Sequence, residues 1–277
     1  MPLPYDASVG APTPLLKEES FHSPIENRKS KIENPSGGLG ERFRGLENVA
    51  DSQNTKRNTK DIPAPKIENS GNVLLDKLFG AELHPMPNGD WQVLYDAAEQ
   101  LAQNLESEGL KVYRIPIGGS SPLGGYAFYE AAQEIAAQAP PFDYIITATS
   151  SGSTQAGLAA GLKQTKTKLI GIAADPEPDL IDDVLRVAHG LSEILKTKTP
   201  TEKDFDVRIE WAHPGYGIPS EKGNRAIETM ARTEGILLDP IYTGKASAAL
   251  LELAESGELE GRVLFWHTGG VPALFTH

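Results

Sequence analysis

The chain has 277 residues, of which 39% are hydrophobic and 23% are charged, an ordinary composition for a globular protein with one large or two modest domains. Its 26 basic and 38 acidic side chains give a net charge of −12, so the overall charge does not favour binding to nucleic acid or to an anionic membrane. The lack of cysteine excludes disulfides, thiolate metal sites and thiol nucleophiles. No transmembrane run or signal peptide is readable, so we expect a cytoplasmic protein.

Residues 1–70 differ in kind from the rest of the chain. They hold 8 of the 21 prolines, show no sustained helical or strand period, and repeat the triplet Ile-Glu-Asn three times. Such a tract buries too little apolar surface to offset the entropy lost on ordering. We therefore expect residues 1–70 to be disordered or of low complexity, and a folded domain to occupy residues 71–277.

From residue 71 onward, helical and strand-like patterns alternate. In chain order, we expect a helix at 73–79, a helix at 91–108, a strand at 111–117, a helix at 126–137, a strand at 144–149, a helix at 154–162, a strand at 168–174, a helix at 181–195, a strand at 207–211, a helix at 220–234, an extended piece at 237–240, a helix at 246–255 and a strand at 262–266. Strands that alternate with helices of this length indicate parallel βαβ units. The predicted fold class is α/β, with an open, mostly parallel sheet.

The loop after the predicted strand 144–149 has the strongest functional signal. It reads TATSSGSTQAG over residues 147–157, so four hydroxyl side chains surround one glycine immediately before a helix. The glycine lets the backbone approach an anion, and the start of a helix presents free N–H groups with a favourable dipole. An ordinary strand-to-helix turn with a Ser or Thr cap is the plainer alternative. We favour a phosphate site, without the spacing of a P-loop.

Four other loops follow predicted strands or extended pieces. GGSSPLGG at 118–125 suits either a ligand loop or a flexible crossover, and PGYGIP at 214–219 carries a tyrosine that either enters a cleft or is merely half-buried. DPIYTGK at 239–245 and FWHTGG at 265–270 form the remaining pair. The six histidines have no metal-ligand spacing, so we expect no metal site.

Several of these stretches together resemble one enzyme family. They are GNVLLDKLFGA at 71–81, IPIGGS at 115–120, the Ser/Gly loop, GYGIP at 215–219, EGILLDPIYTGK at 234–245 and HTGG at 267–270. In this order and spacing they resemble D-cysteine desulfhydrases and 1-aminocyclopropane-1-carboxylate (ACC) deaminases. Those proteins are pyridoxal-phosphate (PLP) enzymes with a fold like that of the tryptophan synthase β-chain, fold type II.

The resemblance implies a role for each loop. The cofactor phosphate would be held by Thr149, Ser150, Ser151, Gly152, Ser153 and Thr154. Tyr242 would stack on the pyridine ring, Tyr216 would approach a small amino-acid substrate, and Thr268 would hydrogen-bond the ring nitrogen. The two tyrosines are the implied catalytic residues. Deaminases look to carry Glu after the stacking tyrosine, whereas this chain has Thr243, which favours the desulfhydrase side.

The chain also departs from the family. The motif Gly-Asn-Lys-x-Arg-Lys, whose lysine forms the Schiff base, is absent, so the Schiff-base lysine cannot be identified and the small domain looks incomplete. Lys245 is close to Tyr242 in sequence, but we expect it to open an exposed helix. The resemblance thus implies a β-eliminating lyase with impaired turnover, truncated on its N-terminal side, with a homodimer as one allowed assembly. A non-catalytic remnant and an ACC-deaminase-like enzyme are the alternatives.

Overall fold

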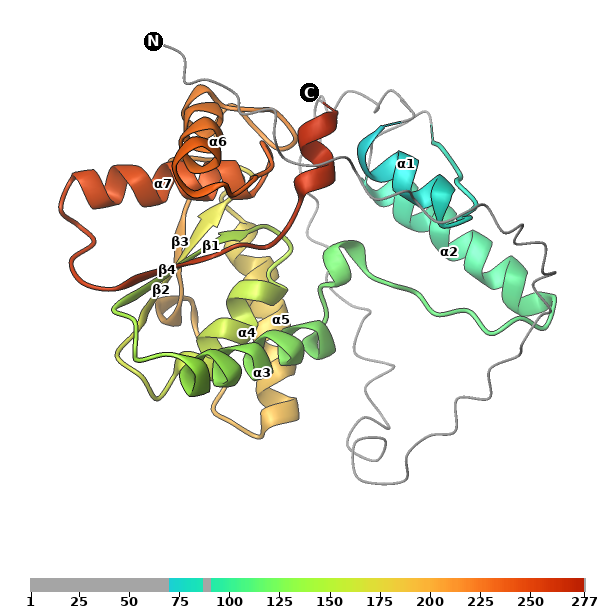
Figure 1. The fold of residues 1–277 in the computed structure, drawn as a ribbon. Coiled ribbons are helices and arrows are strands. Elements are labelled where there is room, and N and C mark those ends of the chain that lie inside the picture. Colours follow the sequence, from blue (N-terminus) through green and yellow to red (C-terminus); the bar gives the residue numbers. More distant parts are fainter. Residues whose placement is uncertain (1–69, 87–90, 277) are drawn as a thin grey trace, which may run out of the picture. The chain divides into compact units, whose positions relative to one another are not determined.

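The structure is a computed structural model that describes residues 70–86 and 91–276, so the expectation of disorder in residues 1–69 lies outside the described residues. The elements, in chain order, are α1 (Gly71–Leu78), α2 (Trp91–Ser107), α3 (Pro122–Gln138), β1 (Tyr144–Thr149), α4 (Ser153–Leu162), β2 (Lys168–Ala173), α5 (Leu180–Leu195), β3 (Asp206–Arg208), α6 (Glu221–Glu234), α7 (Thr243–Glu255) and β4 (Val263–Trp266), with short 3₁₀ turns at Ile117–Gly119, Glu202–Asp204 and Val271–Phe275. Figure 1 shows their arrangement.

The four strands form one parallel sheet in the order β3-β2-β1-β4. Tyr144 at the start of β1 lies opposite Lys168 of β2 and Val263 of β4, so the three strands run in step. Because β1 lies between two neighbours and under helices, all of its residues after Tyr144 are buried. The α/β fold with an open parallel sheet is confirmed.

Helices cover both faces of this sheet (Figure 1). On one face, Ile146 and Ile170 pack with Ala249 and Leu253 of α7. On the other face, the intervening residues of the same strands pack against α3, α4 and α5; Ile145, for example, packs with Leu158 of α4. The period-2 alternation of β1 and β2 therefore separates two apolar layers, and the loops at the carboxyl ends of the strands meet at one edge.

Two helices begin three or more residues earlier than the apolar pattern predicts, and each has a local cause. The Ser121 hydroxyl accepts a hydrogen bond from the Gly124 amide at 3.0 Å, and Pro122 occupies the first turn, so α3 starts there rather than at residue 126. Helix α7 starts at Thr243 rather than at residue 246, next to a buried aspartate described below. Short polar residues, rather than apolar spacing, set both starts.

The predicted strand 111–117 is wrong, and the piece at 237–240 lies outside the sheet. The stretch from Leu110 to the 3₁₀ turn is irregular, and none of its residues joins a ladder in the described part of the chain. Arg114 holds the stretch on α2 by ion pairs to Glu99 (2.6 Å) and Glu106 (2.7 Å). An alternating apolar pattern makes a strand only where a second strand supplies hydrogen-bond partners.

This stretch exposes large apolar side chains and leads to a prediction about solution behaviour. Tyr113 is 78% exposed and Ile115 is 76% exposed. We expect the chain to self-associate, with an apparent mass by light scattering that rises with concentration, because such unpaired apolar stretches pair with other chains. Replacing both residues with Lys should reduce the effect. A wild-type chain that stays monomeric at high concentration would contradict the prediction.

Candidate functional site

The Ser/Gly loop joins β1 to α4 and forms a cup at the start of the helix; we call residues 149–154 the cup. Gly152 caps the helix with a left-handed backbone, φ 97°. Within the cup, the side chains of Thr149 and Ser153 are each 4% exposed, and their hydroxyl oxygens have no hydrogen-bond partner. Two orphaned hydroxyls at a helix N-terminus are unusual in a folded core and call for an explanation.

Gly152 itself has a packing role that the sequence did not indicate. A Cβ atom at this position would lie 2.8 Å from the carbonyl oxygen of Asp183 and 2.9 Å from the Cα of Val184, both in α5. The glycine therefore allows α5 to pack directly against the start of α4. This contact accounts for the glycine without any ligand, so the evidence for an anion site comes from the hydroxyls and the helix end.

The loop at residues 118–125 closes against the cup. The Ser120 hydroxyl donates to the Ser151 hydroxyl at 2.7 Å, and the backbone N–H of Ser153 donates to Ser120 at 3.4 Å. A Cβ atom on Gly118 would lie only 2.3 Å from the Ser151 oxygen. Of the two interpretations of this loop, a ligand loop and a flexible crossover, the contacts favour a wall of the cup.

The two predicted catalytic tyrosines are brought together. Tyr216, in the loop between β3 and α6, and Tyr242, the residue before α7, share a hydrogen bond between their hydroxyl groups. Their rings meet edge to face, with centroids 6.0 Å apart and an interplanar angle of 70°. Both rings are half-buried. Burial, more than the neighbouring Tyr216, raises the pKa of Tyr242 well above its usual range, so its phenol is neutral at pH 7.

Asp239 fixes Tyr242, and the sequence did not single it out for this role. The carboxylate is fully buried. Its Oδ1 accepts the N–H groups of Ile241 (2.8 Å) and Tyr242 (2.7 Å), and its Oδ2 accepts the N–H (3.0 Å) and hydroxyl (2.6 Å) of Thr243. An aspartate that binds amides two to four residues later is the usual start of a capped turn, so the Asp-Pro pair was a readable signal.

The loop after β4 approaches the same turn. A Cβ atom on Gly270 would lie 2.5 Å from Asp239 Oδ2, which shows how closely the two segments pass. The Gly269 N–H donates to His267 Nδ1 at 2.9 Å, so the other ring nitrogen carries the proton and donates to the Leu237 carbonyl at 2.9 Å. Thr268, between them, is exposed. Its hydroxyl is therefore available at the edge where β1 and β4 end.

Lys245 is not where we expected it. The prediction of an exposed helix start is wrong: the side chain is 1% exposed, in the first turn of α7. Its ammonium donates to the carbonyl oxygens of Ala174 (3.0 Å), Ala212 (2.8 Å) and Gly215 (2.7 Å). Burial lowers its pKa to about 8, against the attraction of Asp175 and Asp239. The sequence around Lys245 gives no sign that this side chain is buried. The three carbonyls that bind it are brought to it only by the fold.

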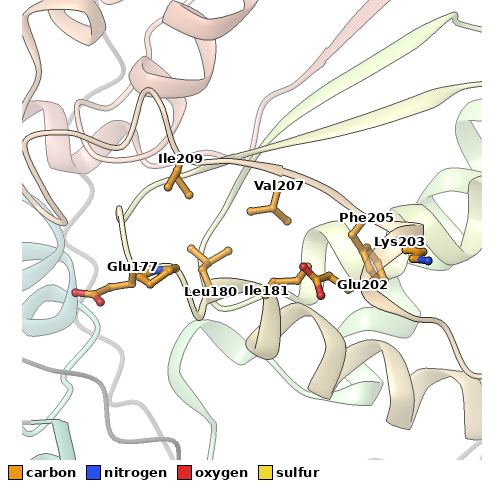
Figure 2. A pocket seen from close by; sticks show the side chains of 9 residues that line it. Glu177, Leu180, Ile181, Glu202, Lys203, Phe205, Val207 and Ile209 are labelled. Atoms are coloured by element: carbon orange, nitrogen blue, oxygen red, sulfur yellow. The ribbon is translucent and has the colours of Figure 1, made fainter.

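A pocket of about 460 Å³ lies elsewhere, between the start of α5 and the segment around β3 (Figure 2). Its walls include Leu180, Phe205 and Val207, and none of the predicted site residues lines it. We therefore define the candidate site by the cup, the tyrosine pair and Thr268. In residues 70–86 and 91–276, no group of three or more His, Asp or Glu side chains could hold a metal ion.

Known proteins resemble this chain over most of its length. A family model described as "Pyridoxal-phosphate dependent enzyme" matches residues 62–269. D-cysteine desulfhydrase of Yersinia enterocolitica is 39% identical over 220 residues, which are 75% of this chain and 64% of that protein. A putative ACC deaminase of Pyrococcus furiosus is 37% identical over 76% of this chain and 65% of its own length. The chain thus spans less than two thirds of these relatives.

The structural comparison agrees with the sequence comparison. The crystal structure of an ACC deaminase homologue superposes with a TM-score of 0.71 at 36% identity, covering 76% of this chain and 66% of the other. The resemblance drawn from the motifs is therefore confirmed, together with the fold. Because the family model spans most of the residues and includes the cup, both tyrosines and Thr268, the chain belongs to the pyridoxal-phosphate dependent enzymes.

Proposed function

We propose that this chain binds the phosphate of PLP in the cup and carries the phosphate and ring-contacting part of a D-cysteine desulfhydrase-type lyase. That reaction removes the α-proton of a small amino acid and eliminates sulfide, leaving pyruvate and ammonia. The observation that carries the proposal is the orphaned Ser153 hydroxyl, buried at the first residue of α4. A phosphate oxygen placed there would accept from it.

The residues present fit the phosphate group. The first amides of α4 have no acceptor within the helix, and the helix dipole favours an anion at this end. Thr149 adds a second buried hydroxyl without a partner, and Ser120 and Ser151 bring two more to the rim. Polar groups buried without partners cost about 1–3 kcal/mol each, which a bound phosphate would recover.

The remaining contacts follow from the same edge of the sheet. When bound, PLP supplies an electron sink for the negative charge left by removal of the α-proton. We assign Tyr242 to the ring face and Thr268 to the ring nitrogen. Tyr216, hydrogen-bonded to Tyr242, is the hydroxyl placed to meet the substrate or move a proton. The support is the contact between the two tyrosines and the position of Thr268 just after β4, because such folds bind ligands at the carboxyl ends of their strands.

Turnover should be impaired because the described residues offer no lysine to anchor the cofactor. Lys245 is the one buried lysine among them, and its three N–H donors are all taken by carbonyls. The other lysines of the described ranges are exposed. Nucleophilic catalysis needs an amine that is both free and fixed beside the reacting atom.

Two further assignments belong to this proposal. We prefer a desulfhydrase to an ACC-deaminase-like enzyme because the position after Tyr242 is Thr243, a neutral residue whose hydroxyl is bound to Asp239. We place the protein in the cytoplasm as a homodimer; the exposed apolar positions support the dimer, and the lack of cysteine fits a reducing compartment. No helix in the described residues combines the length and apolarity needed to cross a membrane.

A serine substitution tests the phosphate assignment. Ser153→Ala removes a hydroxyl that has no partner, so the free protein should unfold at an unchanged or slightly higher temperature. Binding of 4′-deoxypyridoxine 5′-phosphate, which cannot react with surface lysines, should weaken about tenfold to a hundredfold, the value of one hydrogen bond to a charged group. Calorimetric titration measures the affinity.

Ser247→Ala is the matched control. Ser247 is also fully buried with an orphaned hydroxyl, but it lies within α7. Its loss should leave the affinity for the analogue unchanged. Equal affinities in the wild type and Ser153→Ala, or no binding by the folded wild type, would contradict the assignment. Substitutions at Gly152 are unsuitable here because any side chain would collide with α5.

A further inference from the structure

The ammonium of Lys245 joins segments that are far apart in the sequence. One acceptor, the Ala174 carbonyl, follows β2, and the other two, the carbonyls of Ala212 and Gly215, belong to the loop between β3 and α6. The lysine itself lies in the first turn of α7. A single side chain thus joins the segments that follow β2 and β3 to α7, the helix that begins immediately after Tyr242.

The loop that carries Tyr216 is held at two adjacent points by the start of α7. The Gly215 carbonyl accepts from Lys245 at 2.7 Å, and the hydroxyl of the next residue, Tyr216, bonds to Tyr242. The two holding residues are three apart, so they lie on the same side of the helix start. Gly215 and Gly217 flank the tyrosine, and without a tether this short stretch would have wide conformational freedom.

The hydrogen bonds of Lys245 suit a side chain that holds other segments in place rather than one that reacts with a substrate. An ammonium has three N–H donors, and each has a carbonyl acceptor here. Asp175 and Asp239 contribute attraction to the buried charge. A buried cation keeps its charge only when its donors are satisfied, and its removal would leave three carbonyls facing an apolar gap.

We propose that Lys245 is a positioning residue that fixes the Gly215 carbonyl and thereby holds Tyr216 against Tyr242. The tether is a property of the chain without cofactor. Only the use of the tyrosine pair on a substrate rests on the proposed function. The consequence is that replacing the ammonium should loosen one loop while the sheet and the cup keep their structure.

Nitration of tyrosines measures this directly. Tetranitromethane nitrates tyrosines through the accessible phenolate, so Tyr216 and Tyr242, which are half-buried and share a hydrogen bond, should react slowly relative to Tyr113, which is 78% exposed. In Lys245→Met, a neutral side chain of similar length, both should react several-fold faster, as quantified by peptide mass spectrometry. Tyr144 of β1 reports on the sheet, and its rate should not change. General destabilisation would instead accelerate Tyr144 as well.

Chemical rescue separates the charge from the shape. The chain contains no cysteine, so in Lys245→Cys the denatured protein can be alkylated at that one position and refolded. Aminoethylation restores an ammonium at the length of lysine, whereas propylation gives a neutral chain of the same length. We expect slow nitration of Tyr216 to return with the aminoethyl group and not with the propyl group.

The proposal is overturned by equal nitration of Tyr216 in the wild type and Lys245→Met, or by equal protection from the two alkyl groups. If none of the variants folds, the wild type decides. Its Lys245 ammonium protons should exchange with water slowly enough to give a separate ¹⁵N-correlated NMR signal, and rapid exchange like that of the exposed lysines would refute the tether. None of these measurements uses the cofactor, so failure of PLP binding would leave their outcome unaffected.

Discussion

Purified protein given PLP and D-cysteine should release sulfide and pyruvate no faster than the same concentration of PLP alone. The physical reason is the shortage of a usable amine: Lys245 is saturated by three carbonyls, and the other lysines of the described residues are exposed. A misplacement of about 1 Å already costs roughly a hundredfold in rate, so an unplaced lysine does not replace a fixed one. Sulfide detection in the absence and presence of the protein checks the prediction.

The assay has a positive control and a decisive contrary outcome. D-cysteine desulfhydrase of Yersinia enterocolitica, 39% identical over the shared region, should show full turnover under the same conditions. Borohydride treatment of this chain with PLP should label no single lysine in preference to others. Turnover far above the cofactor background that one Lys→Ala substitution abolishes would show that a lysine is correctly placed for catalysis. The prediction of impaired turnover would then be wrong.

Much of the fold was predictable because its signals are local. The run at 144–149 is apolar, β-branched and followed by Ser and Gly, and β1 has those same bounds. The cup could be located for the same reason, since a strand, a glycine and a helix cap are adjacent in sequence. The pairing of Tyr216 with Tyr242 needed the fold, because the two residues are 26 positions apart with α6 between them and only tertiary packing brings them together.

The errors share one physical origin. Residues 111–117 have a strand pattern, but a pattern cannot reveal whether a partner strand is present, and Arg114 instead pairs with α2. Lys245 was expected at the surface because lysine is almost never fully buried, and the carbonyls that bind it come from two segments that are far from it in the sequence. In both cases tertiary partners, which are not local in sequence, decided the outcome.

Asp239→Ala should destabilise the protein by at least about 4 kcal/mol, since it orphans four buried or partly buried donors at about 1 kcal/mol or more each. For a domain of this size the melting temperature should fall by about 8–16 °C. Asp239→Asn should lose less, because its amide oxygen can still accept from Ile241 and Tyr242. Urea unfolding gives the free energies, and the m-value shows whether unfolding remains two-state.

Glu255→Ala is the matched control, because Glu255 is an exposed acidic residue at the last position of α7, and its loss should change stability by no more than about 0.5 kcal/mol. If the two alanine variants unfold at the same urea concentration, the Asp239 network contributes nothing and α7 is held by its apolar face alone. The expected difference has a consequence for the site. Since Asp239 binds the amide of Tyr242, Asp239→Ala should also release Tyr242, so that stability and analogue affinity fall together in this variant, whereas Ser153→Ala lowers affinity alone.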